Sequence, residues 1–188
     1  MKYLPLFLIL LTPLSADPAK WKKGIAKFEA TDKKSPPPKG AYLFIGSSSA
    51  RMWDLKKSFP EYTTINRGFG GSELEDSLFY ADRILIPYQP KVVFLYAGDN
   101  DINNGKTAEI VTADFQKFVT KVHKALPKTD IVFVPIKPSL KRWNLWPKMN
   151  KANQAIQKIT EVNPKLHYLP IPPTMLGKDG KPMNDLFV

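Results

Sequence analysis

Short apolar runs alternate with helical patterns along most of the chain. The runs are rich in β-branched and aromatic residues, as buried strands are, and they cover residues 41–46, 63–68, 91–98, 130–136 and 166–171. Apolar residues recur at helical spacing from Val111 to Leu126, and further helices are expected at residues 49–59, near 73–83 and from Pro147 onward. Strands that alternate with helices predict an α/β domain in which helices cover both faces of a parallel sheet.

The first 39 residues do not follow this alternation. Residues 1–16, MKYLPLFLILLTPLSA, combine an early lysine, an apolar run and small residues at the end, which is the layout of a secretory signal peptide. The run is shorter than the ~20 residues of a transmembrane helix, so no stable membrane anchor is expected. Residues 17–39 are polar and end in KKSPPPKG, which we interpret as a lead-in to one domain spanning residues 40–188.

The composition fits a single exported domain. The 188 residues include no cysteine, so export would involve no disulfide, and we expect a secreted or periplasmic protein of a bacterial envelope. The 28 Lys and Arg exceed the 17 Asp and Glu and give a net charge of +11, which attracts anionic partners such as acidic polysaccharide, lipid headgroups or nucleic acid. Because the basic residues form no long block and no nucleic-acid motif, we expect no nucleic-acid partner.

Polar and glycine-rich segments follow the first three predicted strands. They read GSSS from Gly46, NRGFGGS from Asn66 and GDNDI from Gly98. The carboxyl ends of parallel strands meet at one edge of a sheet, where ligands bind, so we expect these segments to lie together. Each alone has an ordinary structural role as a helix cap, a tight turn or an Asn/Asp turn. Together they offer a hydroxyl nucleophile, backbone N–H groups and a side-chain amide, which are the groups that acyl transfer requires.

These segments resemble the sequence blocks of the SGNH hydrolase family, the GDSL-type esterases and acylhydrolases. The stretch FIGSSSARMW resembles the first block, with Ser48 at the nucleophile and Ser47 where many members carry aspartate. The stretch NRGFGGS resembles the second block, with Gly71 as the backbone oxyanion donor and Gly70 as the close alternative. The G-x-N-D stretch resembles the third block, with Asn100 as the side-chain donor.

The resemblance implies a flavodoxin-like three-layer fold and the hydrolysis of esters, often acetyl or short acyl groups on carbohydrates or lipids. It implies that the N–H of Ser48, the N–H of Gly71 and the amide of Asn100 hold the oxyanion. The implied partner is a small-molecule or carbohydrate ester substrate, and no metal or organic cofactor is expected. The sequence does not predict the oligomeric state.

The resemblance also implies a D-x-x-H segment near the C-terminus, whose histidine is the general base. The sequence ends DGKPMNDLFV, and the LFV run resembles the segment that leads into D-x-x-H. We therefore expect a truncated piece of a longer hydrolase, without its last helix and with apolar surface open near the first strands. The two histidines, His123 and His167, are predicted to lie away from the strand ends, so we expect weak or no activity from these 188 residues.

Arg142, Trp143 and Trp146 follow the fourth predicted strand and are candidate substrate-binding residues. Their indoles could stack on a sugar and the arginine could meet an acidic group, although packing of a helix onto the sheet is the favoured explanation of the tryptophans. Two other functions stay open at this point. One is a catalytically silent domain of the same fold that binds carbohydrate or acylated ligands, and the other is phosphosugar binding at the serine turn.

Overall fold

The computed structural model describes residues 18–186. The predicted signal peptide, residues 1–16, lies outside the described residues and stays a prediction. The described residues form a five-stranded parallel sheet in the order β2-β1-β3-β4-β5. Its strands lie within the five predicted apolar runs and are β1 (Tyr42–Gly46), β2 (Thr64–Gly68), β3 (Val92–Tyr96), β4 (Asp130–Phe133) and β5 (Leu166–Tyr168).

Helices connect the strands, as the alternation predicts. The α-helices are α1 (Lys22–Lys34), α2 (Ser48–Met52), α3 (Leu55–Ser58), α4 (Leu74–Ile84), α5 (Asp99–Asn103), α6 (Ala108–Ala125) and α7 (Trp146–Glu161). Short 3-10 helices cover Pro18–Trp21, Ile86–Tyr88, Leu140–Leu145, Pro172–Met175 and Asn184–Leu186. The predicted α/β, flavodoxin-like fold class is confirmed. The one helix expected at residues 49–59 is divided, because Trp53 is extended and the Asp54 side chain accepts a hydrogen bond from Lys57 N at 3.1 Å, which caps α3.

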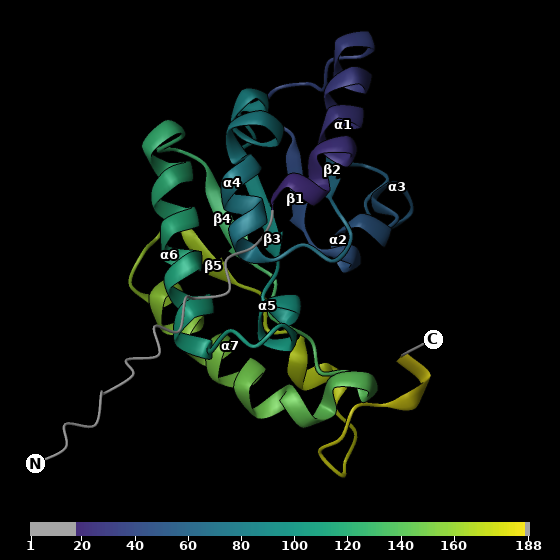
Figure 1. The fold of residues 1–188 in the computed structure, drawn as a ribbon, viewed down its shortest axis with the longest axis vertical. Coiled ribbons are helices and arrows are strands. Elements are labelled where there is room, and N and C mark those ends of the chain that lie inside the picture. The colour runs from purple at the N-terminus through teal and green to yellow at the C-terminus, as the bar shows by residue number, and fades with distance from the viewer. Residues whose placement is uncertain (1–17, 187–188) are drawn as a thin grey trace, which may run out of the picture.

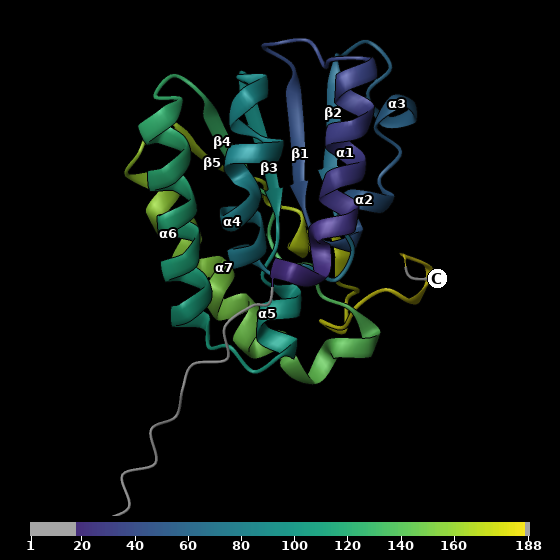
Figure 2. The same cartoon turned by 45° about the horizontal axis from the view of Figure 1, so that its top comes forward.

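The two faces of the sheet are covered differently. Figure 2 shows α1, α4 and α6 side by side across one face, where Leu43 and Ile45 of β1 belong to the main buried cluster. Phe44 points to the opposite face, where it stacks on Phe94 with ring centroids 4.4 Å apart and where α2 and α3 give partial cover. An open aromatic groove of about 250 Å³ remains over β1 and β3 on that face, in agreement with the expected open apolar surface near the first strands.

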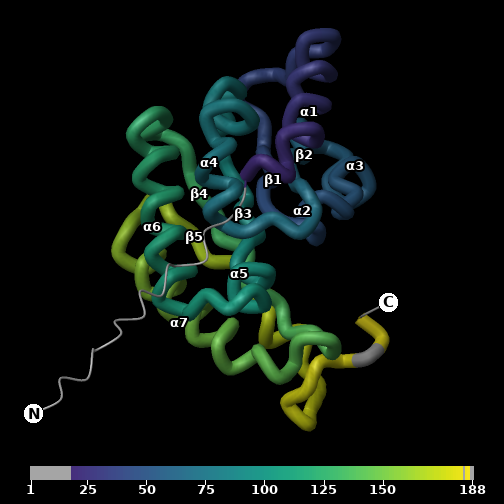
Figure 3. Tube along the Cα trace, in the orientation of Figure 1, coloured from purple at the N-terminus to yellow at the C-terminus, as the bar shows by residue number. Residues whose placement is uncertain are grey.

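The segment predicted as a polar lead-in forms helix α1. Trp21, Ile25 and Phe28 fall on one side of it, and Ile25 is fully buried in the main core. Figures 1 and 3 show α1 beside the sheet near α4, and Arg83 of α4 binds Glu29 of α1 with a nitrogen–oxygen distance of 2.7 Å. Residues 22–34 are therefore part of the folded unit, and the lead-in interpretation is corrected for them.

Candidate active site

The serine turn, the glycine-rich turn and the G-x-N-D segment lie at one edge of the sheet. They follow β1, β2 and β3, which are neighbours in the sheet and run parallel. In Figure 2 the strands point toward the end of the molecule where α2 and α5 begin. The structure thus brings Ser48, Gly71 and Asn100 to the same edge, as the sequence predicts.

Close backbone packing fixes the serine turn. Gly46 has a φ of +130°, and a Cβ there would lie 1.8 Å from the carbonyl oxygen of Tyr96, so only glycine fits. The N–H of Ser47 donates to that same oxygen at 2.9 Å, and the N–H of Phe69 donates to the carbonyl of Gly46 at 2.9 Å. The end of β1 is therefore bound to both neighbouring strand ends, and Ser48 follows as the first residue of α2, partly exposed.

The glycine-rich turn packs against α2 and leaves donors available. A Cβ at Gly68 would lie 2.2 Å from the backbone nitrogen of Arg51, and Asn66 Nδ2 donates to the carbonyl of Ala50 at 2.8 Å. Gly71 has a φ of +78° and is exposed. Within residues 18–186 its N–H makes no hydrogen bond, and the N–H of Ser48 lacks an intrahelical partner because it begins α2. Both N–H groups are free to bind an anionic oxygen.

Contacts on both sides fix the Asn100 amide. Its Nδ2 donates to the carbonyl of Ser72 at 2.9 Å, and its Oδ1 accepts from Arg142 Nη2 at 3.0 Å. A carbonyl only accepts and a guanidinium only donates, so the amide cannot be flipped without losing both bonds. Asn100 is 8% exposed. The second Nδ2 hydrogen remains for a ligand, which is the arrangement that an oxyanion donor needs.

A carboxylate lies beside the serine turn, and it comes from Asp99. The Ser47 hydroxyl donates to Asp99 Oδ1 at 3.3 Å, and Arg142 Nη1 donates to Asp99 Oδ2 at 3.1 Å. Burial raises the pKa of Asp99, and the charge of Arg142 opposes that rise. Asp99 thus places a carboxylate beside Ser47, the position at which the resembling SGNH family often carries aspartate. The sequence analysis missed Asp99, although it occupies the variable position of the G-x-N-D stretch.

Comparisons with known proteins identify the family of this chain. The sequence profile of the GDSL-like lipase/acylhydrolase family matches residues 46–187, which include all three strand-end segments. The chain belongs to this family. Platelet-activating factor acetylhydrolase IB subunit alpha1 from Homo sapiens is 25% identical over 167 residues, which cover 86% of this chain and 70% of that protein.

Solved structures share the fold of this GDSL-family chain. A GDSL-like lipase from Bacteroides thetaiotaomicron matches with a TM-score of 0.75 at 15% identity, over 87% of this chain and 85% of the lipase. A catalytic mutant of an acetylxylan esterase from Geobacillus stearothermophilus matches with a TM-score of 0.56 at 14% identity, over 78% of this chain and 88% of the esterase. At sequence identities this low, the similarity to these structures shows only that the fold is shared.

A buried lysine lies behind the G-x-N-D segment of this GDSL-family chain. Lys106 Nζ lies 3.1 Å from Glu73, 3.2 Å from Asp114 and 3.5 Å from Asp101. Asp101 also accepts from the N–H of Leu74 at 3.1 Å, and burial raises its pKa to about 7 against the opposing charge of Lys106. Burial disfavours the charged lysine, but Asp101 and Glu73 outweigh it and raise the pKa of Lys106. This cluster joins α4, α5 and α6, and the sequence analysis did not find it.

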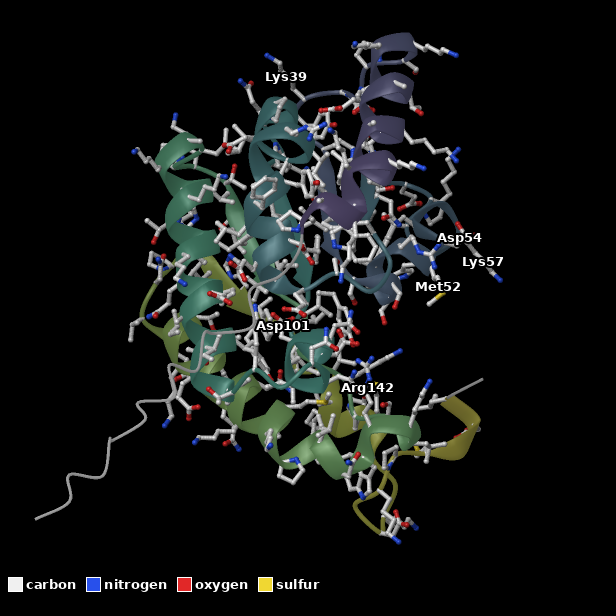
Figure 4. All side chains as sticks on the ribbon, in the orientation of Figure 1. Lys39, Met52, Asp54, Lys57, Asp101 and Arg142 are labelled. Atoms are coloured by element: carbon white, nitrogen blue, oxygen red, sulfur yellow. The ribbon has the colours of Figure 1, made fainter. Side chains whose placement is uncertain are left out.

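The predicted substrate-binding residues lie at the same edge of the sheet. Arg142 belongs to the 3-10 helix Leu140–Leu145, and Figure 4 shows it close to α5. Its guanidinium already binds Asp99 and Asn100 within the protein. The rings of Trp143 and Trp146 stack with centroids 6.1 Å apart, and Trp146 packs against the main core. Substrate binding by these three residues stays a prediction.

Both histidines lie toward the opposite end of the sheet. His123 Nε2 is 3.1 Å from the carbonyl of Thr129, just before β4. His167 Nε2 is 2.9 Å from Oδ1 of Asp130, the first residue of β4. A serine at the carboxyl end of β1 is out of reach of either ring. Neither histidine therefore serves as a base for Ser48 in this arrangement.

Among residues 18–186, none of the helices combines the length and apolar character needed to cross a membrane.

Proposed function

We propose that this protein is a serine ester hydrolase that removes acetyl or short acyl groups from carbohydrate or lipid esters. The observation that carries the proposal is the fixed Asn100 amide, which lies at the same sheet edge as the free N–H of Gly71 and the hydroxyl of Ser48. Membership of the GDSL-like lipase/acylhydrolase family supports it. With the predicted signal peptide, we further propose that the substrate is met outside the cytoplasm.

In this proposal Ser48 Oγ attacks the carbonyl carbon of the ester. Negative charge develops on the carbonyl oxygen, and the N–H groups of Ser48 and Gly71 and the amide of Asn100 stabilise it. The carbon–oxygen bond to the alcohol then breaks, and the alcohol leaves with the proton that the base took from Ser48. Water hydrolyses the acyl-serine and releases the carboxylic acid. The D-x-x-H segment that the family resemblance implies would supply the base.

A second candidate function is a silent domain that binds carbohydrate or acylated ligands. The observation that favours it is the placement of His123 and His167 beside Thr129 and Asp130, far from the serine turn. In that case the oxyanion donors would bind a carbonyl without cleavage. The two functions differ in whether Ser48 forms a covalent bond.

The test is covalent labelling of Ser48 together with ester hydrolysis. Both are measured on the 188-residue protein and on the product of its coding sequence read beyond Val188, with a fluorophosphonate probe and 4-nitrophenyl acetate. We expect labelling and hydrolysis in a product that contains Asp-x-x-His. In that product Ser48→Ala should abolish the labelling and lower kcat for ester hydrolysis by about 10⁴-fold or more. Ser49→Ala is the matched control and should keep both. Activity that survives Ser48→Ala contradicts the proposal.

A further inference from the structure

A cleft of about 660 Å³ separates α1 from the glycine-rich turn after β2. We name it the α1 cleft, and the residues that matter for its chemistry are Trp21, Lys27, Phe28, Arg51, Phe69 and Gly70. Its two walls come from segments far apart in the chain, because α1 packs against the sheet beside α4. The proposed function does not by itself require this cleft.

The α1 cleft begins at the proposed oxyanion turn. Gly70 lines it, and a Cβ at Gly70 would lie 3.0 Å from Nε of Arg51, so the guanidinium group lies directly over the turn. A Cβ at Gly71 would lie 3.4 Å from the ring of Trp21. Arg51 and Trp21 thus flank the two glycines. Because Gly70 lines the cleft, a ligand in the cleft would lie next to the residue that precedes Gly71, whose N–H is the proposed oxyanion donor.

The α1 cleft is positively charged. Lys27, Arg51 and Arg67 line it, and none of the described residues that line it is acidic. Arg67 is neutralised by Asp32, which lies 2.6 Å away. Lys27 and Arg51 are exposed and form no ion pair within residues 18–186. The cleft therefore offers two uncompensated cations to an anionic ligand.

The walls of the cleft favour a sugar over a lipid surface. Trp21 and Phe28 are partly exposed and contribute aromatic rings, whereas Phe69 is buried beneath them, and ring faces stack on the apolar faces of sugars. The described large apolar side chains that are exposed on the molecule, such as Met52 and Phe79, do not line it. A membrane-binding rim would need such side chains around the cations.

We propose that the α1 cleft binds a carboxylate-bearing sugar of an acidic oligosaccharide. In this assignment Arg51 and Lys27 hold the carboxylate while the sugar ring lies against the aromatic wall. The sugar is then the alcohol part of the ester that Ser48 cleaves, and only this last link rests on the proposed function. Binding itself requires no catalytic base.

Isothermal titration of the 188-residue protein with trigalacturonate tests the proposal. The neutral counterpart is the galactose trisaccharide, and vesicles of phosphatidylglycerol test a lipid surface. Arg51→Gln and Lys27→Gln remove the two cations. Lys39→Gln and Lys57→Gln are matched controls, because both residues are exposed, neither lines the cleft, and Figure 4 shows both at the periphery of the molecule.

We expect trigalacturonate to bind at least about tenfold more tightly than the neutral trisaccharide. Arg51→Gln should weaken it about tenfold and Lys27→Gln by a smaller factor, whereas the controls should stay within about twofold. Equal affinity for both trisaccharides, or equal weakening by all four variants, would overturn the proposal. Vesicle binding that depends on Arg51 without trisaccharide binding would overturn it in favour of a membrane surface.

The titration tests the cleft assignment and the esterase assay tests the proposed function, and either proposal can be contradicted without the other. A protein that binds trigalacturonate through Arg51 but hydrolyses no ester supports the cleft assignment and contradicts the proposed function. An active esterase that does not distinguish the two trisaccharides supports the proposed function and contradicts the cleft assignment.

Discussion

One partly exposed and one buried carboxylate flank Asn100, and each meets a different cation. Asp99 faces Arg142 in a pair whose side chains are 16% and 25% exposed. Asp101 faces Lys106 in a pair whose side chains are 0% and 6% exposed. The first pair lies at the sheet edge beside Ser47 and the Asn100 amide, and the second lies behind it among α4, α5 and α6.

The difference in burial gives the two ion pairs different roles: the Arg142 pair orients side chains of the site, and the Lys106 pair stabilises the fold. The Arg142 pair remains accessible and fixes groups that would touch a substrate. The Lys106 cluster is largely closed to solvent, so its charges are compensated mainly by each other, with the more exposed Glu75 and Lys117 at its rim. Helix α5 thus carries two kinds of polar group. Asp99 and Asn100 lie at the sheet edge where a ligand would bind, and Asp101 binds the buried Lys106 and stabilises the packing of the helix. Substitutions on the two sides should therefore affect different measurements.

The largest expected effect is on stability, at Lys106. Replacing it with methionine leaves the carboxylates of Asp101 and Glu73 buried without their cation and leaves Asp114 paired only with the exposed Lys117, which should lower the free energy of unfolding by about 3–5 kcal/mol. Lys117→Gln is the matched control, because Lys117 pairs with the same Asp114 at 2.9 Å but is 64% exposed. It should cost less than about 1 kcal/mol. Urea denaturation followed by circular dichroism measures both, and equal losses would remove the distinction between buried and exposed pairs.

A smaller effect is expected at Arg142, and there it should appear in kcat. Arg142→Gln leaves the Asn100 amide held only by the carbonyl of Ser72, so in a form of the protein that hydrolyses esters kcat should fall about 10- to 100-fold with little change in KM. Arg142→Lys should recover part of the loss, since one ammonium replaces a two-pronged guanidinium. Lys141→Gln is the exposed neighbouring control.

The alternative at Arg142 has a different kinetic signature. If the guanidinium binds an acidic group of the substrate, as the sequence suggests, KM should rise while kcat stays nearly constant. That outcome would contradict a positioning role and restore the substrate-binding interpretation. The same variants should change the unfolding free energy far less than Lys106→Met does, because the pair is partly exposed.

The positions of the strand ends could be predicted from the sequence, but the side-chain contacts between them could not. Strand periodicity placed Ser48, Gly71 and Asn100 at one edge, because parallel strands align their carboxyl ends. The contact from Arg142 to Asp99 spans 43 positions, and local patterns do not report such pairs. For the same reason, nothing in the local sequence distinguished the buried Lys106 from a lysine on the surface. Helix α1 was detectable, since Trp21, Ile25 and Phe28 repeat at helical spacing, but its polar composition and the prolines after it suggested a lead-in outside the domain.

The last expected effect shows itself as a pH dependence, at Asp101. Burial raises its pKa from 3.8 to about 7 in the folded protein, so folding favours the protonated carboxyl. Its contribution to stability is complete below about pH 4 and is lost as the pH rises through about 7. Asp101→Asn stays neutral and keeps an oxygen for the N–H of Leu74. Its unfolding free energy relative to the wild type should therefore rise between about pH 4 and about pH 8.

Asp130 provides the control of opposite sign for this pH dependence. The hydrogen bond from His167 lowers the pKa of Asp130, so its carboxylate contributes stability at neutral pH that is lost as the pH falls. The relative stability of Asp130→Asn should consequently decrease as the pH rises, opposite to Asp101→Asn. Because the ordinary pKa of an aspartate is 3.8, the change at Asp130 falls below about pH 4, so denaturant titrations of both variants from about pH 2 to about pH 8 separate the two carboxyls. A pH-independent difference for Asp101→Asn would mean that Lys106 keeps Asp101 ionised, and the buried cluster would then be a fully charged network at every pH tested.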